Sequence, residues 1–303
     1  MDDNDEDDLN TLVSKHDHTN YIYESIPLFT TCAQIQCNHA FPLPTYKTIQ
    51  GSLASTFQWK KQMQEYQEEY PSELDQKIPK LVWRGSLTGD IQNYTNIRWL
   101  LCKYVTSAPD DEKQYYDIGL TKIPSRHDKV PLNLTIVGDL IPGIFPMAAF
   151  QNYRAILDID GNSWSSRFGS LLCYHSVILK VEPMYVDYFH YTSLIPNVHY
   201  VPVHYNLSNL YSQTLYVMDP NNNNDVQRII RNANAWCQQN LVYSKIANDY
   251  LTIFDQYVGY LDIASASTTT GGIPESNWKT IWNHNKEHYI FPNKEFFNMA
   301  PLK

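Results

Sequence analysis

The fold of this chain is decided by the stretch 155-AILDIDGNSWSSRF-168. Its first six residues predict a buried strand over 155–160, which ends at Gly161. The small hydroxyl residues that follow predict the start of a helix over 165–174. Free backbone N–H groups, hydroxyls and the helix dipole make such a junction suitable for a phosphate, and Arg167 can add a bidentate contact. The alternative interpretation is a capped helix whose arginine faces solvent.

A second segment repeats this arrangement earlier in the chain. The stretch 83-WRGSLTG-89 takes a strand predicted over 80–84 into a Gly/Ser/Thr turn, and 96-NIR-98 then begins a helix that carries Arg98. Two such turns can clasp one diphosphate, although each by itself is also compatible with an ordinary tight turn. Neither segment fits GxxxxGK[ST] or GxGxxG, which excludes a P-loop ATPase and disfavours a classical dinucleotide fold.

Strands and helices alternate along most of the chain. Strands are predicted over 80–84, 115–120, 134–137, 155–160, 176–181 and 199–203. Helices are predicted over 55–70, 96–104, 165–174, 184–191 and 209–261, the last one broken at 219–224. This order is typical of an α/β fold with a parallel sheet. In the last region, the stripe from Val226 to Cys237 predicts a core face of a helix.

Composition limits the class of protein. The 303 residues are 43% hydrophobic and carry a net charge of -9, which favours a globular protein with a large core and argues against nonspecific nucleic-acid binding. No window reaches the roughly 18 apolar residues of a membrane helix, and the acidic start does not resemble a signal peptide. The cysteine spacing predicts no structural zinc site, although Cys32 and Cys37 are close enough to bridge. Asn-X-Ser/Thr sequons at Asn93, Asn133 and Asn206 suit a secretory lumen but also arise by chance, so the redox compartment stays open.

Six sequence blocks together resemble glycosyltransferase family 90, the CAP-domain family of capsule-associated xylosyltransferases and Rumi-type protein O-glucosyltransferases. They are WRGSLTG, NIR, LDIDGNSWSSRF, SVILKVEP, VHYVPV and NLSNL, between about Ile26 and Tyr260. The resemblance implies a GT-B architecture, in which two Rossmann-like domains hold the donor between them. It further implies an inverting transfer of glucose or xylose from a UDP-sugar to a hydroxyl of a glycan or glycoprotein, without an essential metal or a cofactor, in the lumen of the endoplasmic reticulum or Golgi.

The resemblance also assigns roles to residues. Arg167 is expected on the diphosphate, as a catalytic group. The other donor-binding residues that it implies are Arg84, Ser86, Arg98, Asn162, Ser163, Trp164, Ser165 and Ser166.

The sequence departs from the family at the catalytic base. Relatives carry an aspartate in the acceptor domain, upstream of the segment that matches Ile26 to Phe29, and little of this chain precedes that segment. Asp17 is the best-placed carboxylate, the alternative being a solvated loop residue. His39 stands where relatives often carry an Asp-Ile pair, but it is also typical of a surface loop. A second functional hypothesis is therefore a degenerate member that binds nucleotide sugar or glycan without turnover.

The expected organisation follows the resemblance. We expect a disordered acidic tail at 1–20, a remnant of a truncated acceptor-side domain at 21–78, a UDP-sugar-binding Rossmann-like domain at 79–215, C-terminal helices at 216–265 and an irregular tail at 266–303. About seventy residues are few for an independent core, so the acceptor-side segment is expected to dock on the donor domain.

Overall fold

The computed structural model describes part of the chain. The described residues are 28–30, 32–34, 40–44, 64–65, 68–89, 96–123, 146–189 and 193–266. Asp17, His39 and the strand predicted over 134–137 lie outside them. The described strands are β1 (Leu28–Thr30), β2 (Ala33–Gln34), β3 (Ala40–Pro42), β4 (Ile78–Ser86), β5 (Tyr116–Lys122), β6 (Tyr153–Asp158), β7 (Val177–Val181), β8 (Tyr185–Val186) and β9 (Val201–Val203). The described helices are η1 (Leu74–Gln76), α5 (Ile97–Ser107), α6 (Asp110–Lys113), η3 (Met147–Asn152), α8 (Phe168–Leu171), α10 (Leu210–Met218), η4 (Pro220–Asn222), α11 (Asn223–Asn240) and α12 (Tyr243–Ala266).

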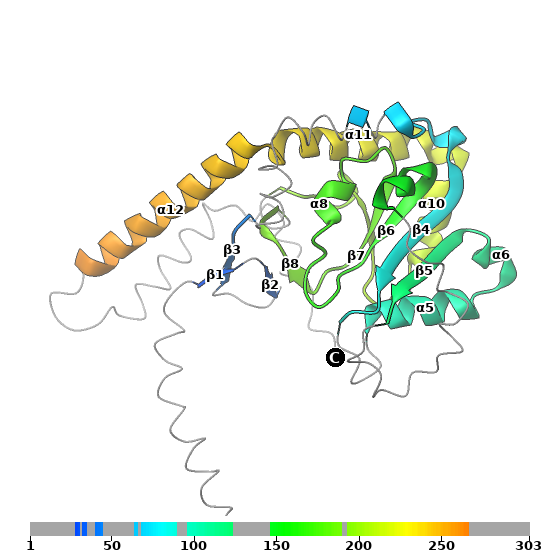
Figure 1. Cartoon of the computed structure of the whole chain (residues 1–303), viewed down its shortest axis with the longest axis horizontal. Helices are drawn as coiled ribbons and strands as arrows, with labels where there is room; N and C mark the ends of the chain where they lie inside the picture. The colour runs from blue at the N-terminus through cyan, green and yellow to red at the C-terminus, as the bar shows by residue number, and fades with distance from the viewer. Residues whose placement is uncertain are drawn as a thin grey trace, which may run out of the picture.

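A parallel sheet of five strands forms the centre of the described structure, in the spatial order β5-β4-β6-β7-β9 (Figure 1). Numbered along the chain, this is the order 2-1-3-4-5 of a doubly wound sheet. The chain moves outward in one direction from β4 to β5 and in the other direction from β6 to β9. The point where the direction reverses lies between β4 and β6. The predicted α/β class with a parallel sheet is confirmed.

The sheet is buried on both faces because its strands alternate between two cores. In β6, Ala155 and Leu157 point into one cluster of buried side chains, whereas Ile156 points into the other. In β4, Leu81 and Trp83 belong to the first cluster and Val82 to the second. Nearly continuous apolar runs such as these are what a parallel sheet covered by helices requires.

Helix α11 is part of this same core. The side chains of its predicted apolar stripe are buried, from Val226 to Cys237, and they contribute to both clusters. A disulfide joins Cys237 to Cys173, just beyond α8. The bridge proposed between Cys32 and Cys37 is not tested, because Cys37 lies outside the described residues.

Two predicted helices differ from the structure. Within 184–191, residues 188–189 are helical as predicted, whereas 185–186 form the short strand β8, which pairs antiparallel with β2. A partner strand far away in the sequence therefore decides the conformation of Tyr185 and Val186. The helix predicted over 165–174 is reduced to α8, because the main chain and side chain of Ser165 bond to Asp160 and Asp158 before the helix begins. Of the helix predicted over 55–70, the described residues 64–65 and 68–69 are helical.

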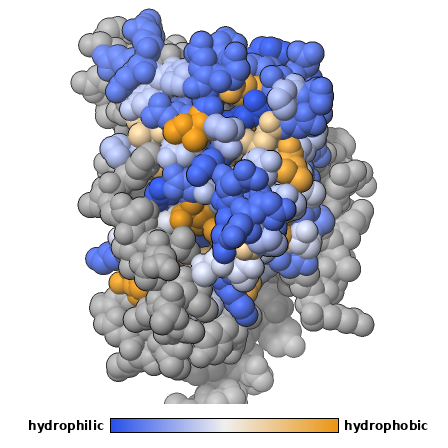
Figure 2. Space-filling view, turned by 90° about the vertical axis from the view of Figure 1, so that its right-hand side faces the viewer, coloured by the Kyte–Doolittle hydropathy of each residue, from blue (hydrophilic) through white to orange (hydrophobic). Residues whose placement is uncertain are grey.

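The described N-terminal strands lie beside the sheet domain. Strands β1 and β3 pair in parallel, and the Tyr250 hydroxyl of α12 donates to the carbonyl of Pro44, just after β3. Helix α12 projects from the sheet domain past β3 (Figure 1). None of the described helices has the length and apolar character needed to cross a membrane. On the face shown in Figure 2, apolar residues lie in small separate patches among polar ones.

Candidate functional site

Two loops meet at the point where the strand order reverses. One follows β4 and the other follows β6. The backbone N–H of Gly89 donates to the side chain of Asn162 at 2.9 Å, which links the two loops directly. The first loop is held by Asn96, whose side-chain amide donates to the Thr88 carbonyl at 2.8 Å while its oxygen caps α5. Ligands of doubly wound sheets bind at this edge and at this reversal, so this position is a candidate binding site.

Glycines allow the loops to approach closely. A Cβ atom on Gly161 would lie 2.8 Å from the Thr88 hydroxyl and 3.1 Å from Nη2 of Arg98. Gly89 has a φ of 108°, and a Cβ there would lie 2.7 Å from the Asn96 side chain. A larger residue at either position would push the loops apart.

A cluster of charges is buried beneath the loops. Asp158 at the end of β6 and Lys180 in β7 are paired in the sheet register, and Lys180 Nζ lies 2.9 Å from Oδ2 of Asp158. Lys180 Nζ also lies 2.6 Å from Oδ1 of Asp160. The side chains of Lys180 and Asp158 are fully inaccessible to solvent. Charges buried to this degree persist only when they are paired, as they are here.

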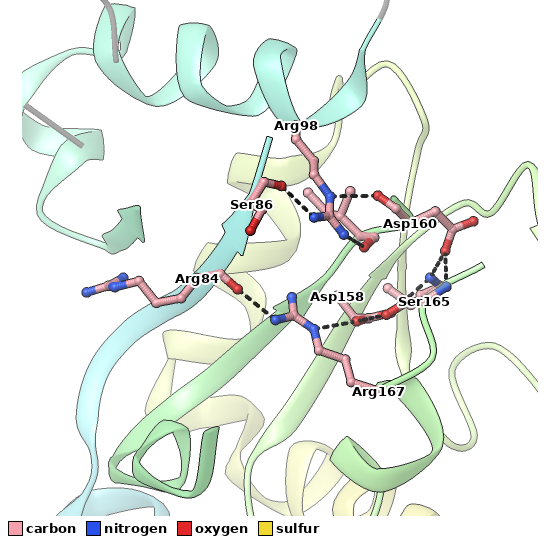
Figure 3. Close-up of polar contacts among 9 residues, drawn as sticks. Arg84, Ser86, Arg98, Asp158, Asp160, Ser165 and Arg167 are labelled. Carbon is pink, nitrogen blue, oxygen red and sulfur yellow. Dashed lines mark hydrogen bonds and ion pairs between the residues drawn. The ribbon is translucent and has the colours of Figure 1, made fainter. Parts of the chain in front are cut away.

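Arg167 and Ser165 are held by this cluster (Figure 3). The Ser165 hydroxyl donates to Asp158 Oδ1 at 2.6 Å. Arg167 Nε lies 3.2 Å from the same oxygen, and its Nη1 donates to the Arg84 carbonyl at 2.7 Å. Its Nη2 is buried and has no hydrogen-bond partner in the part of the chain that the structure describes. The guanidinium therefore has a fixed orientation and still has unused donors.

Arg98 fastens the two loops together from the start of α5. Its guanidinium donates to the carbonyls of Ser86 at 2.6 Å, Ile159 at 3.1 Å and Asp160 at 2.8 Å. These bonds use one N–H of each nitrogen, which leaves a second N–H on both Nη1 and Nη2.

The cluster carries an excess of positive charge. Its three cations are Arg98, Arg167 and Lys180, and its two carboxylates are Asp158 and Asp160, which leaves one net positive charge. Burial, and then the charge of Arg167, lowers the pKa of Arg98 to about 10, although both carboxylates act in the opposite direction. The repulsion between the two arginines favours an anion nearby.

The buried ion pair sets the charge state of its own members. Burial raises the pKa of Asp158, but Lys180 and Arg167 outweigh it, so the pKa is lowered below its usual value. Burial lowers the pKa of Lys180, but the two carboxylates outweigh it, so the pKa is raised. Both groups are therefore charged at neutral pH. The cations also lie over aromatic rings, at 5.2 Å for Lys180 on Phe168 and 5.9 Å for Arg167 on Phe150.

The structure brings most of the predicted donor-binding residues together. Ser86, Arg98, Asn162 and Arg167 take part in contacts between the two segments, and Ser165 bonds to Asp158 beneath them. The loop also contains Ser163, whose carbonyl accepts from Gly161 N at 3.0 Å, the half-buried Trp164 and the exposed Ser166.

Two expectations about the site need correction. The Arg84 guanidinium does not stand beside the loop after β6. Instead, it turns away to pair with Asp117 of β5 at 2.5 Å, and only its carbonyl faces Arg167 (Figure 3). In addition, α8 has four residues and Arg167 precedes it, so the helix after β6 does not supply the long helix dipole that was expected there. Side-chain cations supply the positive potential instead.

Three charged residues of the site carry no role in the sequence-based prediction: Asp158, Asp160 and Lys180. The sequence does contain a pattern that could have identified them. Each is a charged residue within or directly after an apolar run that is typical of a buried strand. Buried charges need partners, and strands 155–160 and 176–181 are consecutive in the predicted sheet. Among the described residues, no group of three or more His, Cys, Asp or Glu is placed to hold a metal ion.

This arrangement can bind an anion. It offers a rigid edge, unused guanidinium N–H groups on two arginines and a net positive charge. Several free donors on two arginines suit an anion that has several acceptor oxygens.

Comparison with known proteins agrees with this chemistry. A curated protein of Invertebrate iridescent virus 3, "Uncharacterized protein 035R", is 32% identical over 149 residues, which is 45% of this chain and only 13% of that protein. The family model described as glycosyl transferase family 90 matches residues 5–270. That match spans well over half of the chain, from before the first described strand to the end of α12. The chain therefore belongs to glycosyl transferase family 90.

Proposed function

We propose that the chain is a glycosyltransferase that moves glucose or xylose from a UDP-sugar to a hydroxyl of a glycan or glycoprotein. The observation that carries the proposal is the convergence of the loops after β4 and β6 at the reversal of strand order, with Arg98 and Arg167 facing the same region. The position suits a nucleotide, and the net positive charge suits a diphosphate. Family membership supports sugar transfer as the reaction.

In the proposed mechanism, the cations act on the leaving group. Breaking the bond between sugar and UDP develops negative charge on the β-phosphate. Arg167, whose Nη2 has no partner among the described residues, and Arg98 would donate to that charge from positions that are already fixed. Preorganised donors of this kind stabilise a transition state without reorganising. We propose that they take the role of a metal, so that neither a metal nor a cofactor is needed.

The sugar carbon would be attacked from the opposite face, with inversion. The transition state at the sugar has oxocarbenium character, and the acceptor hydroxyl needs a carboxylate base within hydrogen-bond reach. Asp17 stays the proposed base. Its replacement, Asp17→Asn, should abolish transfer while leaving the binding of UDP unchanged, and full activity in this variant would exclude Asp17.

We propose a GT-B arrangement in which the acceptor-side segment lies against the sheet domain. The pairing of β2 with β8 and the bond from Tyr250 to the Pro44 carbonyl support it, because both attach N-terminal segments to the sheet domain. The Cys173–Cys237 disulfide supports an oxidising compartment such as the secretory lumen.

Titration calorimetry with UDP tests the proposal. We expect the wild-type chain to bind UDP, and Arg167→Ala to weaken binding by about 10- to 100-fold, since a hydrogen bond to a charged group contributes about 1.5–3 kcal/mol. Arg228→Ala is the matched control, because Arg228 lies half exposed on α11 and pairs with Asp225. Undetectable UDP binding by the wild type, or equal binding by both variants, would contradict the proposal.

The alternative function is a non-catalytic member that binds nucleotide sugar. The departure from the family pattern at the catalytic base favours it, since relatives carry an aspartate upstream of the segment matching Ile26 to Phe29 and Asp17 is the best-placed carboxylate there. Release of UDP from UDP-glucose or UDP-xylose, measured with and without glycan and glycoprotein acceptors, separates the two functions. Binding of UDP without any turnover would favour the binding protein.

A further inference from the structure

The two carboxylates of the site, Asp158 and Asp160, differ in how many of their oxygens accept hydrogen bonds. Both oxygens of Asp158 have partners: Oδ1 accepts from Ser165 and Arg167, and Oδ2 from Lys180. Asp160 uses only Oδ1, which accepts from Lys180 Nζ at 2.6 Å and from Ser165 N at 3.1 Å. Its Oδ2 is buried and has no partner among the residues that the structure describes.

The unpaired oxygen has a fixed place in the site. Two donors hold Oδ1, and Arg98 Nε holds the carbonyl of the same residue at 2.8 Å, so neither the carboxylate nor its backbone can turn freely. Asp160 comes directly after β6 and before Gly161, at the reversal of strand order. About 11% of its side chain is exposed, whereas Asp158 is fully covered. Asp160 is thus the carboxylate of the pair that lies at the margin of the site.

A carboxylate oxygen accepts hydrogen bonds and donates none, so the group that satisfies Oδ2 must be a donor. The nearby cations that bind phosphate would attract the diphosphate of a nucleotide sugar, which itself has no donors when ionised. The hydroxyls of the ribose and of the sugar are the donors on the same molecule. Carboxylates after strands of doubly wound sheets bind hydroxyls in this way.

We propose that Asp160 is a specificity-determining residue whose Oδ2 accepts a hydrogen bond from a hydroxyl of the bound nucleotide sugar. The inference rests on the proposed function, since it needs a nucleotide-sugar ligand. The hydroxyl belongs either to the ribose or to the transferred sugar. A ligand that lacks it leaves a buried acceptor unpaired and therefore binds more weakly.

The test compares ligands on one protein before it compares variants. Calorimetric titrations of the wild type use pyrophosphate, UDP, 2′-deoxy-UDP, 3′-deoxy-UDP and UDP-glucose. The same titrations follow for Asp160→Asn and for Asp110→Asn, which removes the same charge from a fully exposed position on α6. Thermal unfolding of each variant verifies that it folds. The ligand comparison on the wild type stands even if Asp160→Asn does not fold.

If the hydroxyl belongs to the ribose, one of the two deoxy nucleotides should bind the wild type about 10- to 100-fold more weakly than UDP, and Asp160→Asn should remove this difference. If the hydroxyl belongs to the transferred sugar, UDP and its deoxy forms should bind equally well. UDP-glucose should then bind more tightly than UDP, and Asp160→Asn should remove this preference. Asp110→Asn should keep the wild-type pattern. If the wild type binds UDP, both deoxy forms and UDP-glucose equally, or if Asp160→Asn changes the affinity for all of them by one factor, the inference is wrong while the proposed function stands. If the wild type binds no nucleotide, the proposed function itself fails.

Discussion

At the scale of single residues, the candidate site depends on charges placed inside an apolar sheet. Lys180 bridges two carboxylates at 2.9 Å and 2.6 Å, and one of them orients Arg167. Asp158 and Lys180 were recognisable in the sequence as charges in apolar strands. Their pairing was not, because it depends on the register between β6 and β7. The direction of the Arg84 side chain likewise depended on Asp117 in a neighbouring strand.

Replacing Lys180 with methionine should destabilise the protein by about 3–5 kcal/mol, because it leaves buried carboxylates with fewer partners. Urea unfolding followed by circular dichroism measures the change. Lys113→Met is the control, since it breaks an exposed i,i+3 pair with Asp110 and should cost less than about 1 kcal/mol. Equal effects of the two substitutions would show that the buried cluster contributes little.

Gly161→Ala should weaken UDP binding by about tenfold or more, because the added methyl group meets Thr88 and Arg98 and pushes the loops apart. Gly169→Ala in α8 is the control. Its Cβ would meet only Leu241, at an ordinary 3.6 Å, so stability should be kept or should rise by up to about 1 kcal/mol. Calorimetry with UDP gives the first result and thermal unfolding the second. Unchanged affinity in Gly161→Ala would mean that the close approach of the loops is not needed.

The lowered pKa of Lys77 predicts that the stability of the protein depends on pH. Burial lowers its pKa from 10.5 to about 8. Between these values the unfolded chain binds more protons than the folded chain, so this residue makes the free energy of unfolding rise as pH increases from about 8 to 10.5. Urea unfolding across this range should show a smaller rise for Lys77→Met than for the wild type. Identical slopes would contradict the assignment.

At the scale of elements, the segment after the site loop is fastened to α11. Cys173 is bonded to Cys237, and the Asn234 amide donates to the carbonyls of Leu172 and Tyr174, both at 2.9 Å. The sequence predicted the core strands and α11 because their periodicity is strong. It missed β8, whose two residues become a strand only through pairing with β2.

Reducing the disulfide should lower the free energy of unfolding by about 2–4 kcal/mol, because the bond closes a loop with a sequence separation of 64 residues in the unfolded chain. Guanidinium unfolding with and without a phosphine reductant measures this loss. The Cys173→Ser/Cys237→Ser double variant should show the same loss without reductant and no further loss with it. A wild type that is insensitive to reductant would indicate that the bond does not contribute.

At the scale of the whole molecule, ligand binding and folding are coupled. UDP at about 100 times its dissociation constant should stabilise the chain by about 2.7 kcal/mol and raise Tm by about 5–10 °C. If the arginines replace a metal as proposed, excess EDTA should leave this shift unchanged. Scanning calorimetry with and without EDTA decides the matter, and a shift that EDTA removes would overturn the metal-free proposal.

The sequence by itself determined the α/β class, the order of the main strands and the two glycine-containing turns that precede Arg98 and Arg167, because hydrophobic periodicity and such turns are local signals. Only the tertiary structure decided that the two loops touch, that Lys180 joins Asp158 to Asp160, and that Arg84 turns away. The physical reason is that these contacts join residues between 20 and 83 positions apart, through the strand order and register of the sheet. No local pattern specifies that geometry.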